Sequence, residues 1–160
     1  MASKIQNAYI AGIIDGEGSI FIRCQNNLRR RANGCSSEFF LVLDVGNTDK
    51  NLINYLYSLF GGTTGRRKDK RPNTKPMFNW RVTSKKAMSI LEAVYPYMIV
   101  KRQQVDIARK FQQTKIQTSE RRYNKLSTKT IKKRIYLMNA LSSINRYSGR
   151  IQRRNKNVCI

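Results

Sequence analysis

Apolar residues recur along this chain with two different periods, and these periods predict an ordered series of helices and strands. Ile10, Ile13 and Ile14 are spaced as one helical face, whereas other runs alternate apolar with polar residues as strands do. Glycines or prolines separate the runs. In chain order the predicted elements are a helix over 5–16, strands over 19–25 and 38–45, a helix over 49–60, strands over 63–70 and 77–83, and a helix over 84–95.

Two further helical patterns follow, one after Pro96 and one over residues 127–147. The order helix, two strands, helix, two strands, helix predicts an α+β fold of the αββαββα type, with an antiparallel sheet and extra C-terminal helices. We expect a single domain over residues 1–148, with a core at 5–113 and a C-terminal helical extension at 114–148, followed by a basic tail at 149–160.

The chain is strongly basic. Its 160 residues include 32 lysines and arginines but nine acidic residues, so the formal net charge is +23. Such a surface indicates a polyanionic partner, because neutralising phosphates releases counterions from nucleic acid. An anionic membrane is the alternative, but no apolar run approaches the ~20 residues of a membrane span. We therefore expect a nucleic-acid partner and no membrane partner.

Histidine is absent, and its absence excludes several classes of catalyst. Serine–histidine hydrolases, histidine-metal nucleases and Cys2His2 fingers all need this residue. The chain also lacks the glycine-rich Gly-Lys-Ser/Thr loop of phosphate-loop ATPases. Cys24, Cys35 and Cys159 lack the paired spacing of a zinc site or a disulfide framework. Because no signal-peptide core occurs at the N-terminus, we expect a protein that is not secreted.

Small residues recur at every fourth position of the first predicted helix. Ala8, Gly12 and Gly16 form a smooth stripe along which a second helix can pack closely. The spacing is equally compatible with packing against the chain's own sheet and with a dimer interface. Asp15 and Glu17 follow at the helix C-terminus, where the dipole is already negative and acidic residues cost stability. A divalent cation would relieve that cost, since magnesium prefers carboxylate and carbonyl ligands.

Residues 9–19, Tyr-Ile-Ala-Gly-Ile-Ile-Asp-Gly-Glu-Gly-Ser, resemble the LAGLIDADG motif of homing endonucleases. The resemblance includes the αββαββα order and covers roughly the first 110 residues. It implies that two motif helices pack together and that Glu17 and the Gly16 carbonyl bind a metal ion beside the scissile phosphate. The chain holds a single motif, so a homodimer is implied. The implied interface residues are Ala8, Gly12, Ile13, Asp15 and Gly16.

Two further residues match positions that surround the metals in this family. Asn47 follows the second strand, where relatives usually have glutamine, and Lys101 follows the Pro96 segment. The resemblance implies catalytic roles for Glu17, Asn47 and Lys101, with Lys101 stabilising phosphate charge or positioning the attacking water. Without the motif, Lys101 would be one surface lysine among many. The implied cofactor is Mg²⁺ or Mn²⁺, and we expect Ca²⁺ to bind without supporting cleavage.

The predicted strands carry a polar face that the resemblance assigns to the major groove of DNA. Arginine can pair with guanine, amides with adenine, and carboxylates with base amines, so Glu38 and Asp44 are the best candidates for direct base readout. A solvated sheet face is the alternative interpretation. The predicted DNA-binding residues are Arg23, Gln25, Asn27, Arg29, Arg30, Arg31, Glu38, Phe40, Asp44, Thr64, Arg66, Lys68, Lys70, Asn79 and Arg81.

Three functions are compatible with these features. The first is a homing endonuclease, a homodimer that cuts both strands of a long, roughly palindromic double-stranded DNA site, leaves staggered 3′ overhangs and promotes intron homing. The second is an RNA maturase that helps its host intron to splice without cleaving DNA. A ribosomal or architectural protein ranks last, because it leaves the acidic helix end unexplained. An intron-encoded protein would belong to a chloroplast or mitochondrion if its intron lies there, and would otherwise be intracellular.

Overall fold

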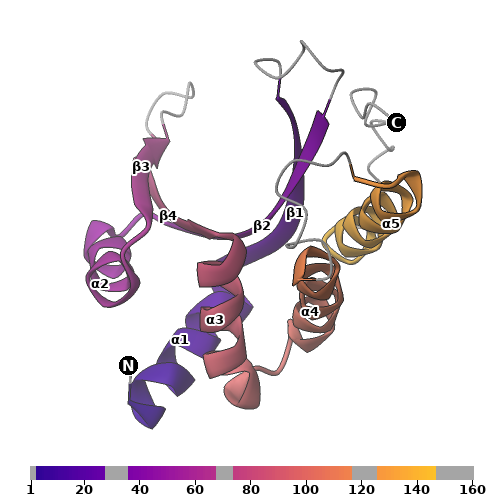
Figure 1. Cartoon of the computed structure of the whole chain (residues 1–160). Coiled ribbons are helices and arrows are strands. Elements are labelled where there is room, and N and C mark those ends of the chain that lie inside the picture. The colour runs from indigo at the N-terminus through magenta and orange to yellow at the C-terminus, as the bar shows by residue number, and fades with distance from the viewer. Residues whose placement is uncertain (1–2, 28–35, 68–73, 117–125, 147–160) are drawn as a thin grey trace.

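The computed structural model describes residues 3–27, 36–67, 74–116 and 126–146 (Figure 1). The order of its elements confirms the predicted α+β arrangement, with further helices after the αββαββα core. The elements are α1 (Lys4–Glu17), β1 (Gly18–Asn27), β2 (Ser36–Asn47), α2 (Lys50–Phe60), β3 (Thr63–Arg67), β4 (Met77–Thr83), α3 (Ser84–Val94), the 3-10 turn η2 (Tyr95–Tyr97), α4 (Arg102–Ile116) and α5 (Thr128–Ile144).

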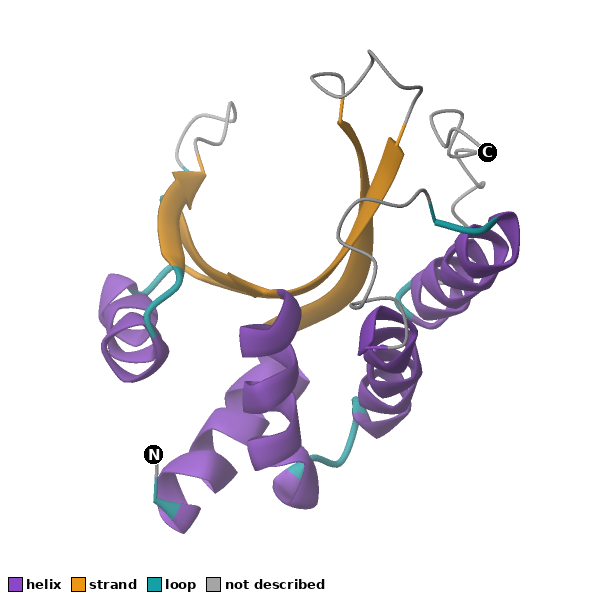
Figure 2. Ribbon diagram, viewed as in Figure 1, coloured by secondary structure: helices purple, strands orange, loops and turns teal. Residues whose placement is uncertain are grey.

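The four strands form one antiparallel sheet in the order β1-β2-β4-β3, so β2 and β4 are central. The sheet is strongly curved, and the helices lie on its convex side (Figure 2). α2 lies at the β3 end, α1 and α3 beneath the middle, and α4 and α5 at the β1 end (Figure 1). None of the described helices covers the concave face (Figure 2). Within the described ranges, no helix is long and apolar enough to cross a bilayer.

α1 continues into β1 without a loop, and its two ends explain its bounds. Ser3 accepts a hydrogen bond from the Gln6 N–H at 3.2 Å, and the Gln6 side chain accepts one from the Ser3 N–H at 2.8 Å. At the other end a Cβ at position 18 would lie 2.6 Å from the Ile14 carbonyl oxygen, so only glycine permits the direct passage from helix to strand. The helix therefore ends at Glu17, one residue later than predicted, and Gly18 is its C-cap.

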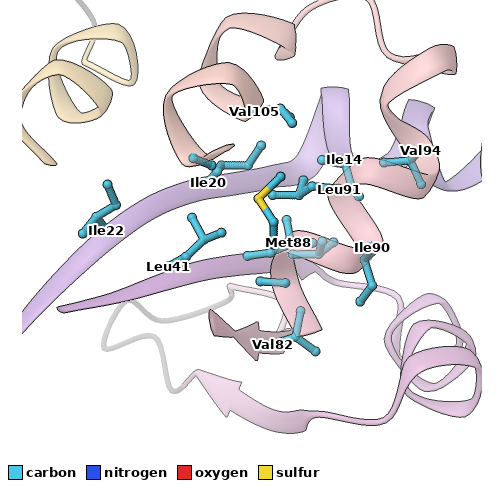
Figure 3. Close-up of a cluster of buried hydrophobic side chains, with 14 of the residues drawn as sticks. Ile14, Ile20, Ile22, Leu41, Val82, Met88, Ile90, Leu91, Val94 and Val105 are labelled. Atoms are coloured by element: carbon cyan, nitrogen blue, oxygen red, sulfur yellow. The ribbon is translucent and has the colours of Figure 1, made fainter. Parts of the chain in front are cut away.

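The core lies between the convex face of the sheet and the helices (Figure 3). Alternate strand residues point into it, among them Ile20, Ile22 and Leu41, and they meet Met88 and Leu91 of α3. Burying one such side chain contributes about 1.5–3 kcal/mol. This one-sided burial holds the sheet against the helices and leaves the concave face free for other contacts.

α5 completes the core at the β1 end of the sheet. Leu137, Met138 and Leu141 belong to the buried core cluster, and the Asn145 side chain just after α5 donates to the Ile20 carbonyl at 2.7 Å. A second group of contacts joins α5 to α4. The buried Arg134 donates to the Thr114 hydroxyl at 3.0 Å and to its carbonyl at 2.9 Å. The apolar face of this C-terminal helix is thus part of the folded core.

Candidate functional site

Glu17 is the last residue of α1, at the junction between that helix and the sheet, and its side chain is exposed. Among the residues that the structure describes, none forms a hydrogen bond or ion pair with its carboxylate. The last carbonyls of a helix are short of partners, and they add negative charge at this position. An exposed carboxylate without a hydrogen-bond partner beside these carbonyls favours the binding of a cation.

The carboxylate of Asp15 holds the segment that precedes α4. It accepts hydrogen bonds from the backbone N–H groups of Ile99 at 2.7 Å, Val100 at 3.1 Å and Lys101 at 3.0 Å. Burial alone would raise the pKa of Asp15, but these donors and the Lys101 charge together lower it below its ordinary value. Backbone amide donors and the Lys101 ammonium therefore stabilise this carboxylate, which corrects our interpretation that a divalent cation relieves the charge of Asp15.

Lys101 lies against the C-terminal end of α1. Its Nζ donates to the Ile14 carbonyl at 3.0 Å and also to the Asp15 carbonyl. Desolvation by burial lowers the pKa of Lys101, and the charges of Asp15 and Glu17 oppose this shift without overcoming it. The structure therefore brings the Lys101 ammonium to the same helix end that carries Glu17, although the two lie 84 positions apart in the sequence.

Asn47 lies at the same end of the sheet as Glu17. The register pairs Gly18, the residue after Glu17, with Val45, and Asn47 follows Val45 by two residues at the end of β2. Its Oδ1 accepts the Asp49 N–H at 2.8 Å in the turn that leads to α2. One lone pair of that oxygen remains, and the amide Nδ2 is a donor that Asn47 can offer to a water or a phosphate.

The end of α1 carries oxygen donors of the kind that bind a metal ion. Within the described ranges, no group of three or more histidine, cysteine, aspartate or glutamate side chains could hold an ion. The end of α1 offers the Glu17 carboxylate and the Gly16 carbonyl, which are hard oxygen donors of the kind that Mg²⁺ prefers. The donor chemistry fits this cation, and further ligands have to come from water, a phosphate or a second protomer.

The small-residue stripe of α1 is open. Ala8, Gly12 and Gly16 are exposed, and a Cβ at Gly12 or Gly16 would meet no atom within 4 Å. The stripe therefore does not pack against the chain's own sheet, and Ile13 beside it is half-buried. Large apolar side chains are also exposed on α1 and on the segment that Asp15 holds. They are Ile5 at 84%, Tyr9 at 57%, Ile99 at 86% and Val100 at 68%.

Several predicted DNA-binding residues share the concave face at the β1 end. Arg23, Gln25 and Glu38 are exposed, and Phe40 is half-buried. The register pairs Arg23 with Phe40 and Gln25 with Glu38, so these side chains form two neighbouring rows across β1 and β2. Polar groups suited to base edges therefore project from this part of the sheet, as the alternation predicts.

The strand register corrects the predicted position of two residues in β3. Thr64 pairs with Trp80, which is fully buried on the convex side. Paired residues project from the same face, and Arg66 follows Thr64 by two positions, so both belong to the convex side. The residue that shares the face of Arg81 is its partner Thr63. The prediction was wrong because it relied on positively charged residues. In an edge strand without alternating apolar residues, charge does not show which side chains lie on the convex side of the sheet.

The environment of Asp44 also changes its interpretation. Asp44 is 5% exposed, and its carboxylate oxygens accept hydrogen bonds from Arg81 at 2.9 Å and Asn79 at 3.3 Å. A carboxylate that is buried and engaged in this way is a poor acceptor for a base amine. Arg81 and Asn79 are the half-buried partners that remain on the surface of the concave face.

Some predicted DNA-binding residues lie outside the described part of the chain. They are the side chain of Asn27, the loop residues Arg29, Arg30 and Arg31, and the second-loop residues Lys68 and Lys70. The predicted basic tail at 149–160 also lies outside it. Two glycines beside Asn79 shape the site but were not predicted from the sequence. They are Gly46 and Gly65. An isolated glycine within a strand pattern is the only sequence signal that could have indicated them.

The family model for LAGLIDADG endonucleases matches residues 10–109, from the middle of α1 into α4. The chain belongs to the LAGLIDADG endonuclease family. The matched region of this LAGLIDADG endonuclease includes Glu17, Asn47 and Lys101. No curated protein matches the sequence.

Solved structures share the fold of this LAGLIDADG protein. The homing endonuclease I-CvuI, in complex with its target in the presence of Ca, is 17% identical with a TM-score of 0.70, over 92% of this chain and 87% of that chain. The archaeal intron-encoded homing endonuclease I-Vdi141I, complexed with DNA, is 18% identical with a TM-score of 0.68, over 91% and 87%. I-SmaMI, bound to an uncleaved DNA target in the presence of calcium ions, is 18% identical with a TM-score of 0.61, over 86% and 45%.

Proposed function

We propose that this LAGLIDADG endonuclease is a homodimeric homing endonuclease that recognises a long, roughly palindromic double-stranded DNA site. It hydrolyses one phosphodiester bond in each strand, leaves staggered 3′ overhangs and so promotes homing of its intron. Family membership and the uncovered concave face of the sheet support this activity. The related I-CvuI, I-Vdi141I and I-SmaMI were each solved with DNA or with a target, and this chain resembles their fold along most of its length.

The observation that carries the proposal is the position of Glu17 between two open surfaces. On one side lies the small-residue face of α1, where Gly12 and Gly16 leave space for a second helix. On the other side α1 passes directly into β1 and the concave sheet. A dimer formed through α1 would place two Glu17 carboxylates near its axis, with a DNA-reading sheet on either side.

Each proposed catalytic residue has a defined task in this arrangement. Glu17 and the Gly16 carbonyl would hold a divalent cation, which polarises the phosphate and lowers the pKa of water when it is bound. Lys101 would donate to a phosphate oxygen as negative charge develops there. The Asn47 amide would orient the attacking water through its Nδ2 group. Asp15 contributes indirectly, because it holds the backbone of Lys101 against α1.

The proposed cofactor is Mg²⁺, with Mn²⁺ as a substitute, because both cations accept an all-oxygen ligand set. Ca²⁺ would occupy the same donors without supporting cleavage. Calcium is present in the complex of I-CvuI with its target and in the complex of I-SmaMI with an uncleaved DNA target, and the second complex is compatible with this expectation.

The test is cleavage of a pooled library of duplex DNA by the purified protein in Mg²⁺ and, separately, in Ca²⁺, followed by sequencing of the new ends. The library should include DNA from uninterrupted host genes. We expect staggered cuts at one long site in Mg²⁺ and binding without cuts in Ca²⁺. Glu17→Gln and Lys101→Met should retain binding but lower the cleavage rate at least ~100-fold, the typical contribution of one catalytic group.

A matched control is Glu92→Gln, which also removes one carboxylate but lies on α3, where Glu92 pairs with Arg109. It should cut like the wild type at 25 °C. Tight binding without any Mg²⁺-dependent cut would overturn the endonuclease proposal and favour a splicing role on RNA. Equal cleavage by Glu17→Gln and the wild type would overturn the assignment of Glu17.

A further inference from the structure

One row of residues crosses the entire concave face close to the acidic end of α1. From β1 to β3 the register aligns Ser19, Asp44, Arg81 and Thr63. Ser19 follows Glu17 by two residues. In the proposed complex this row therefore lies over the base pairs nearest to the scissile phosphates.

Asp44 binds two polar side chains of β4 on this face, those of Arg81 and Asn79. Arg81 Nη2 donates to Asp44 Oδ2 at 2.9 Å, and Asn79 Nδ2 donates to Asp44 Oδ1 at 3.3 Å. The Asp44 side chain is 6% exposed, whereas the Arg81 side chain is 34% exposed. The carboxylate thus lies beneath the surface, and the guanidinium is the charged part of the pair that reaches solvent.

Arg81 retains donors that can contact DNA. Its Nε is buried without a hydrogen-bond partner, and Nη2 uses one N–H group on Asp44. Within the described residues the other N–H group of Nη2 and those of Nη1 donate no hydrogen bond, and two such groups on one edge of a guanidinium match the O6 and N7 acceptors of guanine in the major groove. Because Asp44 already holds the side chain, less rotamer freedom is lost when this edge binds.

Glycines on both neighbouring strands leave the sheet surface around Asn79 without side chains. Its two cross-strand partners are Gly46 on β2 and Gly65 on β3. A Cβ at Gly65 would lie 2.9 Å from Asn79 Oδ1, so a side chain there would displace the amide. The nearest atom to a Cβ at Gly46 would be Met77 Sδ at 3.7 Å, an ordinary contact. The protein can therefore accept a methyl group at position 46, but not at position 65 without moving Asn79.

We infer that Asp44, Arg81 and Asn79 form one base-reading unit, in which Arg81 selects guanine at a base pair near the cut and Asp44 is a positioning residue without a DNA contact. The inference rests on the proposed DNA cleavage. Asp44 sets the direction of the guanidinium, and Asn79 holds the second carboxylate oxygen. The two glycines leave room for the edge of the base pair. Loss of Asp44 frees Arg81 to move, so base preference falls while attraction to phosphates persists.

The test measures binding and cleavage of the selected site and of every single-base-pair variant of it. We expect the wild type to prefer guanine at one position of each half-site by roughly 5- to 100-fold. Arg81→Ala removes this preference at that position alone, and Asp44→Asn weakens it at the same position. The double variant behaves like Arg81→Ala. Gly46→Ala, which the fold accepts, lowers affinity for the whole site, whereas Asp106→Asn, on α4, changes nothing.

Three outcomes would overturn the inference. A changed preference at a different base pair in Asp44→Asn would mean that Asp44 reads DNA itself. A lower melting temperature with an unchanged base preference would mean that it only stabilises the sheet. A wild-type preference that survives Arg81→Ala would exclude Arg81, even if Asp44→Asn fails to fold. If the wild type selects no DNA site, the proposed function fails instead, and this result is distinct from all three.

Discussion

The Asp15 carboxylate lies at the negative end of the α1 dipole, where a lone acidic residue is unfavourable. Its three hydrogen-bond donors, the N–H groups of residues 99–101, stand immediately before α4. The Asp15 carboxylate, although unfavourable at the end of α1, therefore accepts hydrogen bonds from the backbone N–H groups immediately before α4. This single side chain links the two segments that carry Glu17 and Lys101.

Asp15→Asn should lower the free energy of unfolding by about 1–3 kcal/mol, because the new amide group turns a donor toward backbone N–H groups that need an acceptor. The cleavage rate should fall as well, since the Lys101 segment is no longer held. Urea unfolding and single-turnover cleavage measure the two effects. Asp49→Asn is a matched control, because it exchanges one good N-cap of α2 for another. Equal stability of Asp15→Asn and the wild type would contradict the role of Asp15.

At the scale of elements, a charged cluster joins α3 to α4. Arg109 donates to both oxygens of Glu92 at 2.8 Å and to Asp106 at 2.8 Å, and its guanidinium lies 4.7 Å from the centre of the Tyr95 ring. The hydrogen bonds from Arg109 lower the pKa of Glu92 below its ordinary value. The cluster therefore contributes to the packing of α3 against α4, on the convex side of the sheet.

Glu92→Gln should lower the melting temperature at neutral pH, and the difference should vanish in acid. The folded pKa of Glu92 lies below the ordinary 4.5, so its stabilisation is complete above pH 4.5 and is lost as the pH falls through the folded value. The pair is partly exposed, so we expect no more than about 1 kcal/mol. Melting curves of both proteins from pH 7 to pH 2.5 test this. A difference that persists at the acid limit would point to lost packing.

The exposed stripe of α1 gives a second prediction for an element. Gly12→Leu should yield a monomer that folds as stably as the wild-type protomer, because a Cβ there meets no atom within 4 Å and leucine is a better helix former by ~1 kcal/mol. Cleavage of both strands should be lost with the dimer. Sedimentation and light scattering measure the mass. Ser89→Leu adds the same side chain at an exposed position of α3 and should remain dimeric. A dimeric Gly12→Leu protein would exclude this interface.

For the whole molecule, the dominant features are a net charge of +23 and a sheet whose concave face is left open by the described helices. The charge attracts polyanions without regard to sequence, whereas the strand side chains can read base edges. These two contributions respond differently to salt. Attraction to phosphates weakens as salt rises, while the preference between one base pair and another changes little.

Affinity for the selected site should fall steeply with salt, by roughly 10³- to 10⁵-fold between 50 and 200 mM, if the dimer makes about six to ten phosphate contacts. Fluorescence anisotropy over a series of KCl concentrations measures the slope. The slope of Gly12→Leu should be about half that of the wild type, because one protomer contacts half the phosphates. A slope near zero would mean that the basic residues face away from DNA.

By itself, the sequence determined the order of the elements, the core face of the central strands and the segment that carries the family motif. In β4 the buried residues Trp80 and Val82 alternate with the half-buried Asn79 and Arg81, so burial follows the alternation of apolar and polar residues in the sequence. These features are accessible because periodicity records burial locally, residue by residue. A dense motif such as residues 9–19 is equally local.

Only the tertiary structure decided which charges meet. Arg81 and Asp44 are 37 positions apart, and Lys101 and Asp15 are 86 apart, so nothing local indicates that either carboxylate is engaged. The face of Thr64 depended on its register with Trp80, and the place of α5 depended on its docking against β1. Register, curvature and docking follow from packing between distant segments. The sequence shows where the charged residues are, but the fold determines which of them form pairs.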